Sequence, residues 1–267
     1  MKLKTTKLSD FDNLELKNAT FQNRNFPNHF HDTYSIGLIK KGVEKVTINN
    51  QTLLATSNSV VIINPFEIHS NSFYDNEKWT YYSLYLNKDI LKYCSKKQNL
   101  DNKPSFQFKN IITDKKLYHQ LYNFHSNPTE KTENKLTEIV TQLVVNYQEE
   151  VDIKTKYYAK EINTINEIVA YFESYFFDKI KIDAMSKKYK LSSSQLIRAF
   201  KAHTGLTPIS YVTLLKLNHS KKLILQNQSI LHVALECGFY DQSHFTHYFL
   251  KFFGISPLNF KKNYVTL

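Results

Sequence analysis

Three histidines in the first third of the chain have a spacing that could serve metal binding or polar recognition. His29 and His31 form an H-F-H pair before an expected strand, which puts both imidazoles on one face, and His69 follows further on. Three imidazoles can close a metal site. The usual carboxylate ligand is missing, because neither Glu44 nor Glu67 has ligand spacing. We therefore predict histidines that line a polar pocket or have structural hydrogen bonds, with no metal and no cofactor. Metal binding stays the alternative.

No other residues are spaced for catalysis. The sequence has no Ser/His/Asp or Cys/His order typical of nucleophilic enzymes and no glycine-rich loop that could hold a phosphate. Its two cysteines, Cys94 and Cys237, lie far apart without metal-ligand spacing, which favours reduced thiols in a cytoplasmic protein. We therefore predict that the chain is not an enzyme.

One arginine in the C-terminal half suggests contact with nucleic acid. The chain has two arginines, Arg24 and Arg198, against 33 lysines. Where lysine is the default cation, an arginine indicates chemistry that lysine cannot supply. Its planar guanidinium can bind O6 and N7 of one guanine together. A phosphate contact or an intramolecular ion pair is the alternative role for Arg198.

The positive charge is concentrated in the same region. The net charge is +11, and residues 187–267 contain eleven Lys/Arg against two acidic residues. A basic C-terminal region joined to a nearly neutral one indicates a polyanionic partner. A lysine-rich, solvated surface would give the same charge without any partner.

The segment that carries Arg198 occurs twice. Residues 192–208 (SSSQLIRAFKAHTGLTP) and 241–257 (DQSHFTHYFLKFFGISP) align at a constant offset of 49 residues. In each copy a residue that can cap a helix start comes first, a glycine follows about a dozen residues later, and a hydroxyl residue then precedes proline. A short amphipathic helix is expected before each copy. The pattern predicts two helix-turn-helix units.

The residues around these units predict an all-helical domain from Asn163 to the end of the chain. A closing helix is expected over 257–264. Residues 208–225 should form a connecting helix with these inward-facing residues: Ile209, Val212, Leu215 and Leu223. Two units joined by a rigid helix could enter successive major grooves, about 34 Å apart, on one face of DNA.

The N-terminal region is predicted to form strands up to about residue 85. Residues 35–54 alternate β-branched and polar side chains, with turn signals at Gly42 and Asn49-Asn50. Residues 59–70 and 79–86 follow as further strands. Several short strands at close spacing indicate a sandwich or barrel, and the mouth of a barrel is a usual place for a small ligand.

An apolar stripe at helical spacing follows the strands: Leu136, Ile139, Val140, Leu143, Val144 and Tyr147. It could cover the barrel or pack on a second copy, and we favour the dimer because two-fold homodimers are the commonest assembly. Charged residues 151–161 predict a linker. The linker divides the chain into a domain over 1–150 and a domain over 162–267.

Membrane and export signals are not expected. No window approaches eighteen uninterrupted apolar residues, and the N-terminal lysines have no apolar core behind them. We therefore predict a cytoplasmic protein without a membrane partner.

The stretch over 182–264 resembles the AraC/XylS family of bacterial transcription regulators. The resemblance is carried by LSSSQLIRAFKAHTGLTPISY at 191–211, SILHVALECGFYDQSHF at 229–245 and FFGISPLNF at 252–260. The N-terminal HFHDTYSIGLIKKG and IINPFEIHS are similar to that family's cupin-like effector-binding and dimerisation domain. The resemblance implies a multidomain α and β protein: an N-terminal cupin-like β-barrel with flanking helices, and a C-terminal all-α double helix-turn-helix domain.

The resemblance also implies which residues face DNA. They are Ser194, Gln195, Ile197, Arg198 and Lys201 in the first unit and Gln242, Ser243, Thr246 and His247 in the second. His247 stands where the family often has arginine, and Ile197 offers only an apolar surface, for instance to a thymine methyl group. The first unit, with Arg198, should therefore carry more of the base discrimination.

The partners implied by the resemblance are double-stranded promoter DNA, a small-molecule effector, RNA polymerase and a second copy of the chain. The expected pocket-lining residues, suited to a sugar or an aromatic metabolite, are His29, His31, Tyr34, His69, Trp79 and Tyr81. Three functions stay open: a ligand-gated activator, which we favour, a ligand-independent regulator with a structural barrel, and a metal-dependent cupin enzyme fused to a DNA-binding domain.

Overall fold

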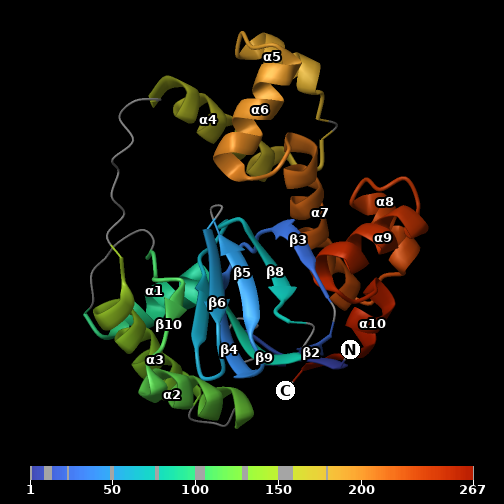
Figure 1. Cartoon of the computed structure of the whole chain (residues 1–267). Coiled ribbons are helices and arrows are strands. Elements are labelled where there is room, and N and C mark those ends of the chain that lie inside the picture. The colour runs from blue at the N-terminus through green and yellow to red at the C-terminus, as the bar shows by residue number, and fades with distance from the viewer. Residues whose placement is uncertain are drawn as a thin grey trace. The chain divides into compact units, whose positions relative to one another are not determined.

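The chain folds into two compact units in a computed structural model (Figure 1). The structure describes residues 2–8, 14–22, 24–48, 51–75, 78–99, 106–127, 132–149, 159–178 and 180–266. The first unit contains residues 1–26, 30–151 and 262–267, and the second contains residues 27–29 and 152–261. Residues 27–29 belong to a strand that is hydrogen-bonded into a sheet of the first unit.

A seven-stranded sheet is the centre of the first unit. Its strands, in spatial order, are β10 (Ile111–Ile112), β7 (Val60–Ile63), β4 (Tyr34–Lys41), β9 (Trp79–Leu86), β2 (Leu14–Phe21), β1 (Lys2–Leu8) and β11 (Tyr264–Thr266). Neighbours are antiparallel apart from β1 and β11, which run parallel. The strands rich in Ile, Val and Tyr have the side chains that a half-buried pleated surface favours.

A four-stranded sheet packs on one face of the larger sheet. Its strands are β3 (Phe26–His29), β8 (His69–Phe73), β5 (Glu44–Ile48) and β6 (Gln51–Ala55), in that order. One buried cluster joins Ile39, Val61 and Ile63 of the larger sheet to Val46 and Ile48 of the smaller one. The two sheets thus enclose a common interior, which confirms the predicted cupin-like barrel.

Three helices cover the other face of the larger sheet: α1 (Lys88–Lys97), α2 (Lys115–Ser126) and α3 (Thr132–Tyr147) (Figure 1). The apolar stripe predicted for a helix lies on α3 and is buried in the largest core cluster, with Leu136, Val140 and Leu143 fully covered. The preferred interpretation of this stripe as a dimer surface is therefore wrong. Its side chains are needed to shield Ile36 and Leu84 of the sheet from water.

The second unit is helical. Its helices are α4 (Ala159–Tyr175), α5 (Ile182–Lys188), α6 (Ser193–Thr204), α7 (Pro208–Leu225), α8 (Ile230–Glu236), α9 (Gln242–Phe253) and α10 (Pro257–Lys262). Most of the predicted linker lies outside the described residues, and α4 already includes its last three positions.

The predicted start and stop signals of the repeated segment have the expected geometry. Ser192 caps α6 and Asp241 caps α9, each by accepting a hydrogen bond from a backbone N–H of the first turn. Gly205 and Gly254 end these helices in the left-handed conformation, with φ of 73° and 74°. Pro208 stands in the first turn of α7, as predicted.

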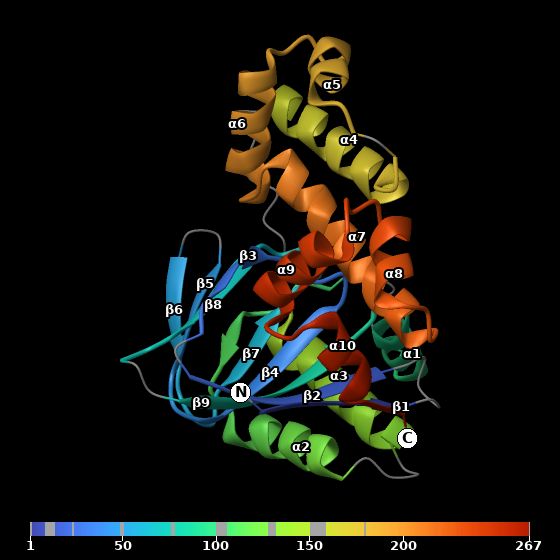
Figure 2. The ribbon, with the colours of Figure 1, turned by 90° about the vertical axis from the view of Figure 1, so that its right-hand side faces the viewer.

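Helix α7 joins the two helix-turn-helix units and is buried around most of its circumference. It contacts α4, α6 and α8, and α8 packs on α9 (Figure 2). Helix α6 belongs to the first helix-turn-helix, and α8 and α9 form the second. Ile209, predicted to face inward, is 68% exposed because it lies on the outer side of the first turn. The expected closing helix stops at Lys262, and the residues after it pair with β1 as β11.

Replacing the helix cap of α6 should destabilise the second unit. The Ser192 hydroxyl accepts from the Gln195 N–H (3.2 Å), and the Gln195 side chain accepts from the Ser192 N–H (2.9 Å), which forms a complete capping box. Ser192→Ala should lower the unfolding free energy by about 1 kcal/mol in urea denaturation. The matched control is Ser174→Ala, an exposed serine that bonds only the Ala170 carbonyl in its own helix. Equal stability of the two variants would contradict the prediction.

Candidate functional site

Helix α6 has one buried and one exposed face. Leu196 and Phe200 are fully buried, four residues apart, and fix the helix against the unit's core. Three predicted DNA-facing residues of this helix, Ser194, Arg198 and Lys201, are exposed and follow one another at intervals of three or four residues, whereas Ile197 is half-buried. The exposed residues thus form one polar, basic stripe.

Arg198 is free to meet a ligand. Its side chain is exposed, and within the described ranges no carboxylate forms an ion pair with it. An intramolecular ion pair, the alternative raised from the sequence, is therefore not its role in the described part of the chain. A guanidinium held in water on a rigid helix can reach an anionic or guanine partner without first breaking a salt bridge.

Helix α9 repeats this arrangement. Phe245 and Phe249 are fully buried, while Gln242, Ser243 and His247 are exposed and Thr246 is half-buried. The same burial pattern at matching positions shows that the two helices present equivalent faces. The second face carries a neutral amide, two hydroxyls and an imidazole in place of arginine.

Gln195 has a structural task that sequence reasoning missed. It was grouped with the DNA-facing residues, and its side chain is exposed. Its Oε1 atom accepts the backbone N–H of Ser192 as half of the capping box. The signal was present in the sequence, since Ser followed three residues later by Gln is the capping-box pattern.

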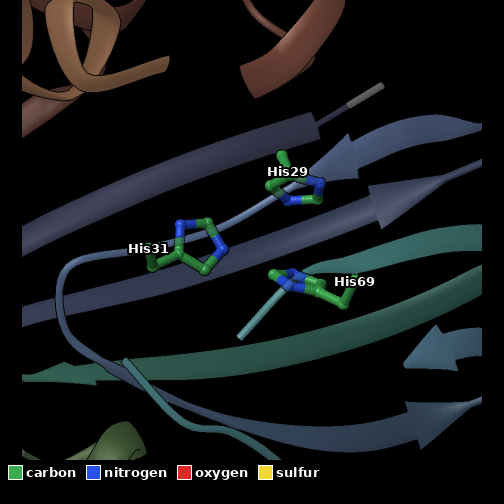
Figure 3. A group of neighbouring side chains, drawn as sticks. All are labelled: His29, His31 and His69. Carbon is green, nitrogen blue, oxygen red and sulfur yellow. The ribbon is translucent and has the colours of Figure 1, made fainter. Parts of the chain in front are cut away.

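In the barrel, the structure brings the three histidines together. One possible ligand nitrogen from each of His29, His31 and His69 lies within 4.8 Å of the other two. Figure 3 shows the rings arranged around a common space, with His29 at the end of β3, His31 in the loop after it and His69 at the start of β8. The rings of His31 and His69 have centroids 5.1 Å apart.

Two backbone carbonyls orient two of these rings. The Nδ1 atom of His29 lies 2.8 Å from the Pro27 carbonyl oxygen, and that of His69 lies 3.0 Å from the Glu67 carbonyl oxygen. A carbonyl oxygen only accepts, so each Nδ1 carries a proton, and in the neutral form of either ring the lone pair lies on Nε2. Burial lowers the pKa of His69 to about 4, which favours this neutral form.

A loop with a left-handed residue connects the segment of His31 to the segment that leads into His69. Phe66 has a φ of 62°, in the left-handed region, and its N–H donates to the His31 carbonyl at 2.8 Å. The Glu67 carboxylate accepts from the backbone and the side chain of Asn64 and from the side chain of Asn110. Because this carboxylate has several partners, the loop keeps a conformation that would otherwise be costly.

The remaining predicted pocket residues divide between two faces of the larger sheet. Trp79 and Tyr81 point into the interior between the sheets, where Trp79 is fully buried against Phe21. Tyr34 is not brought to this group. Its ring packs in the cluster under the helices, and its hydroxyl donates to the Phe106 carbonyl at 2.8 Å. Strand alternation places Tyr34 on the helix-covered face.

Sequence reasoning missed a buried acid in the barrel as a site residue. Glu44 is 7% exposed, and the Asn71 side-chain amide donates to its Oε1 at 2.8 Å. Burial raises the pKa of Glu44 to about 7, and the hydrogen bond from Asn71 opposes this effect. Its place at the inward positions of β5, with Val46 and Ile48, was the available signal.

Comparison with known proteins agrees with both the barrel and the pair of helix-turn-helix units. Residues 13–143 match the AraC-like ligand binding domain, and residues 185–263 match a helix-turn-helix domain. The RhaS transcriptional activator of Escherichia fergusonii is 26% identical over 251 residues, which cover 87% of this chain and 86% of RhaS. The chain is an AraC-family transcription regulator.

Two further comparisons extend over most of this AraC-family chain. The uncharacterized regulator YbfI of Bacillus subtilis is 24% identical over 224 residues, which cover 82% of this chain and 81% of YbfI. The crystal structure of ToxT from Vibrio cholerae superposes with a TM-score of 0.61 at 11% identity, over 94% of this chain and 98% of ToxT. The similarity to ToxT shows that the two proteins share a fold.

The helices of this regulator are too short or too polar to cross a lipid bilayer. This holds for all helices within the described residues.

Glu44 should make the stability of this AraC-family barrel depend on pH. A raised pKa in the folded state means that its contribution is present below the unfolded value of 4.5 and is lost as the pH rises through about 7. Relative to Glu44→Gln, the wild type should therefore lose up to about 3 kcal/mol of unfolding free energy over this range, at about 1.4 kcal/mol per pKa unit.

Urea denaturation of both proteins at several pH values measures this difference. His69 acts in the opposite direction, because its lowered pKa removes stability as the pH falls toward 4. It is present in both proteins, so the comparison isolates Glu44. Glu138→Gln, an exposed substitution on α3, is the control and should show no such trend. A pH-independent difference for Glu44→Gln would refute the prediction.

Proposed function

We propose that this chain is a sequence-specific transcription activator that works as a DNA-binding regulator and not as an enzyme. The observation that carries the proposal is the pair of capped helices, α6 and α9, whose equivalent faces are exposed and polar at both ends of the buried helix α7. Such helices can lie in successive major grooves of promoter DNA. The related RhaS is a transcriptional activator, which supports activation by this chain, and we expect activation to involve contact with RNA polymerase.

In this proposal α6 carries most of the base discrimination. Arg198 would bind guanine through O6 and N7, and Ser194 and Lys201 would contact bases or phosphates along the same groove. Ile197, half-buried, would contribute an apolar edge. On α9, Gln242 would bind adenine. His247 would bind guanine more weakly than an arginine at the same position.

We propose further that the barrel binds a small-molecule effector. Its interior combines imidazoles, the Glu44–Asn71 pair and the ring of Tyr81, all polar groups that can fix a ligand's orientation. ToxT, which shares the fold, has been crystallised with an unsaturated fatty acid. We expect the protein to act as a homodimer in the cytoplasm, through a surface other than the buried stripe of α3.

Replacing Arg198 should relax one position of the DNA site. Arg198→Ala should weaken binding to the preferred promoter fragment by about 1–3 kcal/mol and reduce discrimination at one base pair. Selection from a random DNA library, followed by titrations at fixed salt, measures both effects. Lys96→Ala, an exposed cation on α1, is the control and should keep the site preference. An unchanged preference in Arg198→Ala would remove this residue from the readout.

Effector binding should raise the stability of the first unit. At one hundred times its dissociation constant a ligand that binds only the folded state adds about 2.7 kcal/mol. A thermal-shift screen of sugars, aromatic metabolites and carboxylic acids, repeated on Tyr81→Phe, should find compounds whose effect depends on the barrel. If no compound stabilises the wild type, the protein is a ligand-independent regulator with a structural barrel.

A further inference from the structure

The histidine cluster of the barrel contains the donor atoms of a metal site. His29, His31 and His69 each offer a ring nitrogen, and these nitrogens lie within 4.8 Å of one another. The residues come from the end of β3, the loop after it and the start of β8, so only the fold unites them. Three protein ligands on one ion is the number found in catalytic and exchangeable zinc sites.

The hydrogen bonds of two rings match those of metal-bound histidines. His29 and His69 use Nδ1 as the donor to the carbonyls of Pro27 and Glu67. In the neutral rings Nε2 is then the nitrogen that can bind a metal ion, and Figure 3 shows the three rings around one space. Ligating histidines usually donate their other ring N–H to a carbonyl or carboxylate, which fixes the tautomer and the ring plane.

The backbone around the cluster restricts how far the rings can separate. Phe66 donates its N–H to the His31 carbonyl, which joins the loop of His31 to the segment that leads into His69. On β8, His69 pairs in register with Ile48 of β5. Tyr85 packs edge-on against the His31 ring, at 5.3 Å between centroids. Two loops and a sheet therefore hold the ligands near one another.

We propose that His29, His31 and His69 bind one divalent transition-metal ion of the zinc class. A tetrahedral ion with Zn–N bonds of about 2.0–2.1 Å places its nitrogen ligands about 3.4 Å apart. The candidate nitrogens lie within 4.8 Å of one another, so ion binding requires them to approach by at most about 1.4 Å. Imidazole ligands suit zinc, cobalt, nickel and copper, whereas magnesium and calcium require oxygen ligands.

The neighbouring carboxylates are engaged elsewhere. Glu67 accepts from Asn64 and Asn110, and Glu44 accepts from Asn71. Among the described residues the group that could hold an ion therefore consists of three imidazoles, which bind a metal ion in their neutral form. An ion bound there keeps its full charge and has one open tetrahedral position. Water, hydroxide or an anionic small molecule would complete the coordination.

Metal binding by the full, tag-free chain tests this proposal. After treatment with a chelator and its removal, equilibrium dialysis against Zn²⁺ should give one ion per chain, and dialysis against Mg²⁺ should give none. His31→Gln and His69→Gln should each weaken Zn²⁺ binding by at least about 10-fold. His119→Gln, the same substitution at an exposed position of α2, is the matched control and should bind like the wild type.

Cobalt binding supplies a second measurement, which uses the wild-type protein alone and so does not require any variant to fold. Co²⁺ in the wild type should give the visible absorption of a four- or five-coordinate ion without a thiolate charge-transfer band, because Cys94 and Cys237 are buried away from the cluster's ligand set. Circular dichroism in chelator checks that each variant is folded. Substoichiometric zinc, a thiolate band, or equal affinity in the folded His31 and His69 variants would overturn the proposal.

Discussion

The burial of α7 is the constraint on which the DNA-binding half depends. Residues all around this helix, from Tyr211 and Leu214 to Ile224, are buried, because it packs against α4 and α6 near its start and α8 near its end. A helix buried around most of its circumference cannot rotate about its axis without exposing core residues to water. The hydroxyl of Tyr211 donates to Glu173 of α4 at 3.0 Å and fixes the rotation further. The packing of α7 thus fixes the orientation of α6 relative to α9 in the absence of DNA.

The barrel solves a different problem, since it must keep polar groups in an apolar interior. Isoleucine, valine and aromatic side chains line the space between the sheets. Three of the polar groups there have specific partners: Asn71 for Glu44, and backbone carbonyls for His29 and His69. Buried polar groups with partners specify one arrangement, whereas unpartnered ones would destabilise the fold by about 1–3 kcal/mol each.

The features that could be predicted from the sequence are those that depend on interactions between residues close together in the chain. The helix starts at Ser192 and Asp241 and the stops at Gly205 and Gly254 follow from side-chain capping and a left-handed backbone, which neighbouring residues determine. The resemblance to a known family supplied the two-domain architecture. Features that depend on distant pairing were not predictable: the face on which Tyr34 lies, the choice between the two interpretations of the α3 stripe, and β11.

Strand β11 makes the first unit discontinuous in sequence. Tyr264, Val265 and Thr266 pair in parallel with Thr5, Thr6 and Lys7, and the Tyr264 hydroxyl donates to Glu15 at 2.9 Å. The helical unit is therefore an insertion, entered from the sheet domain after residue 151 and left again at residue 262. A fusion partner attached behind Thr266 would compete with the outermost strand of the sheet.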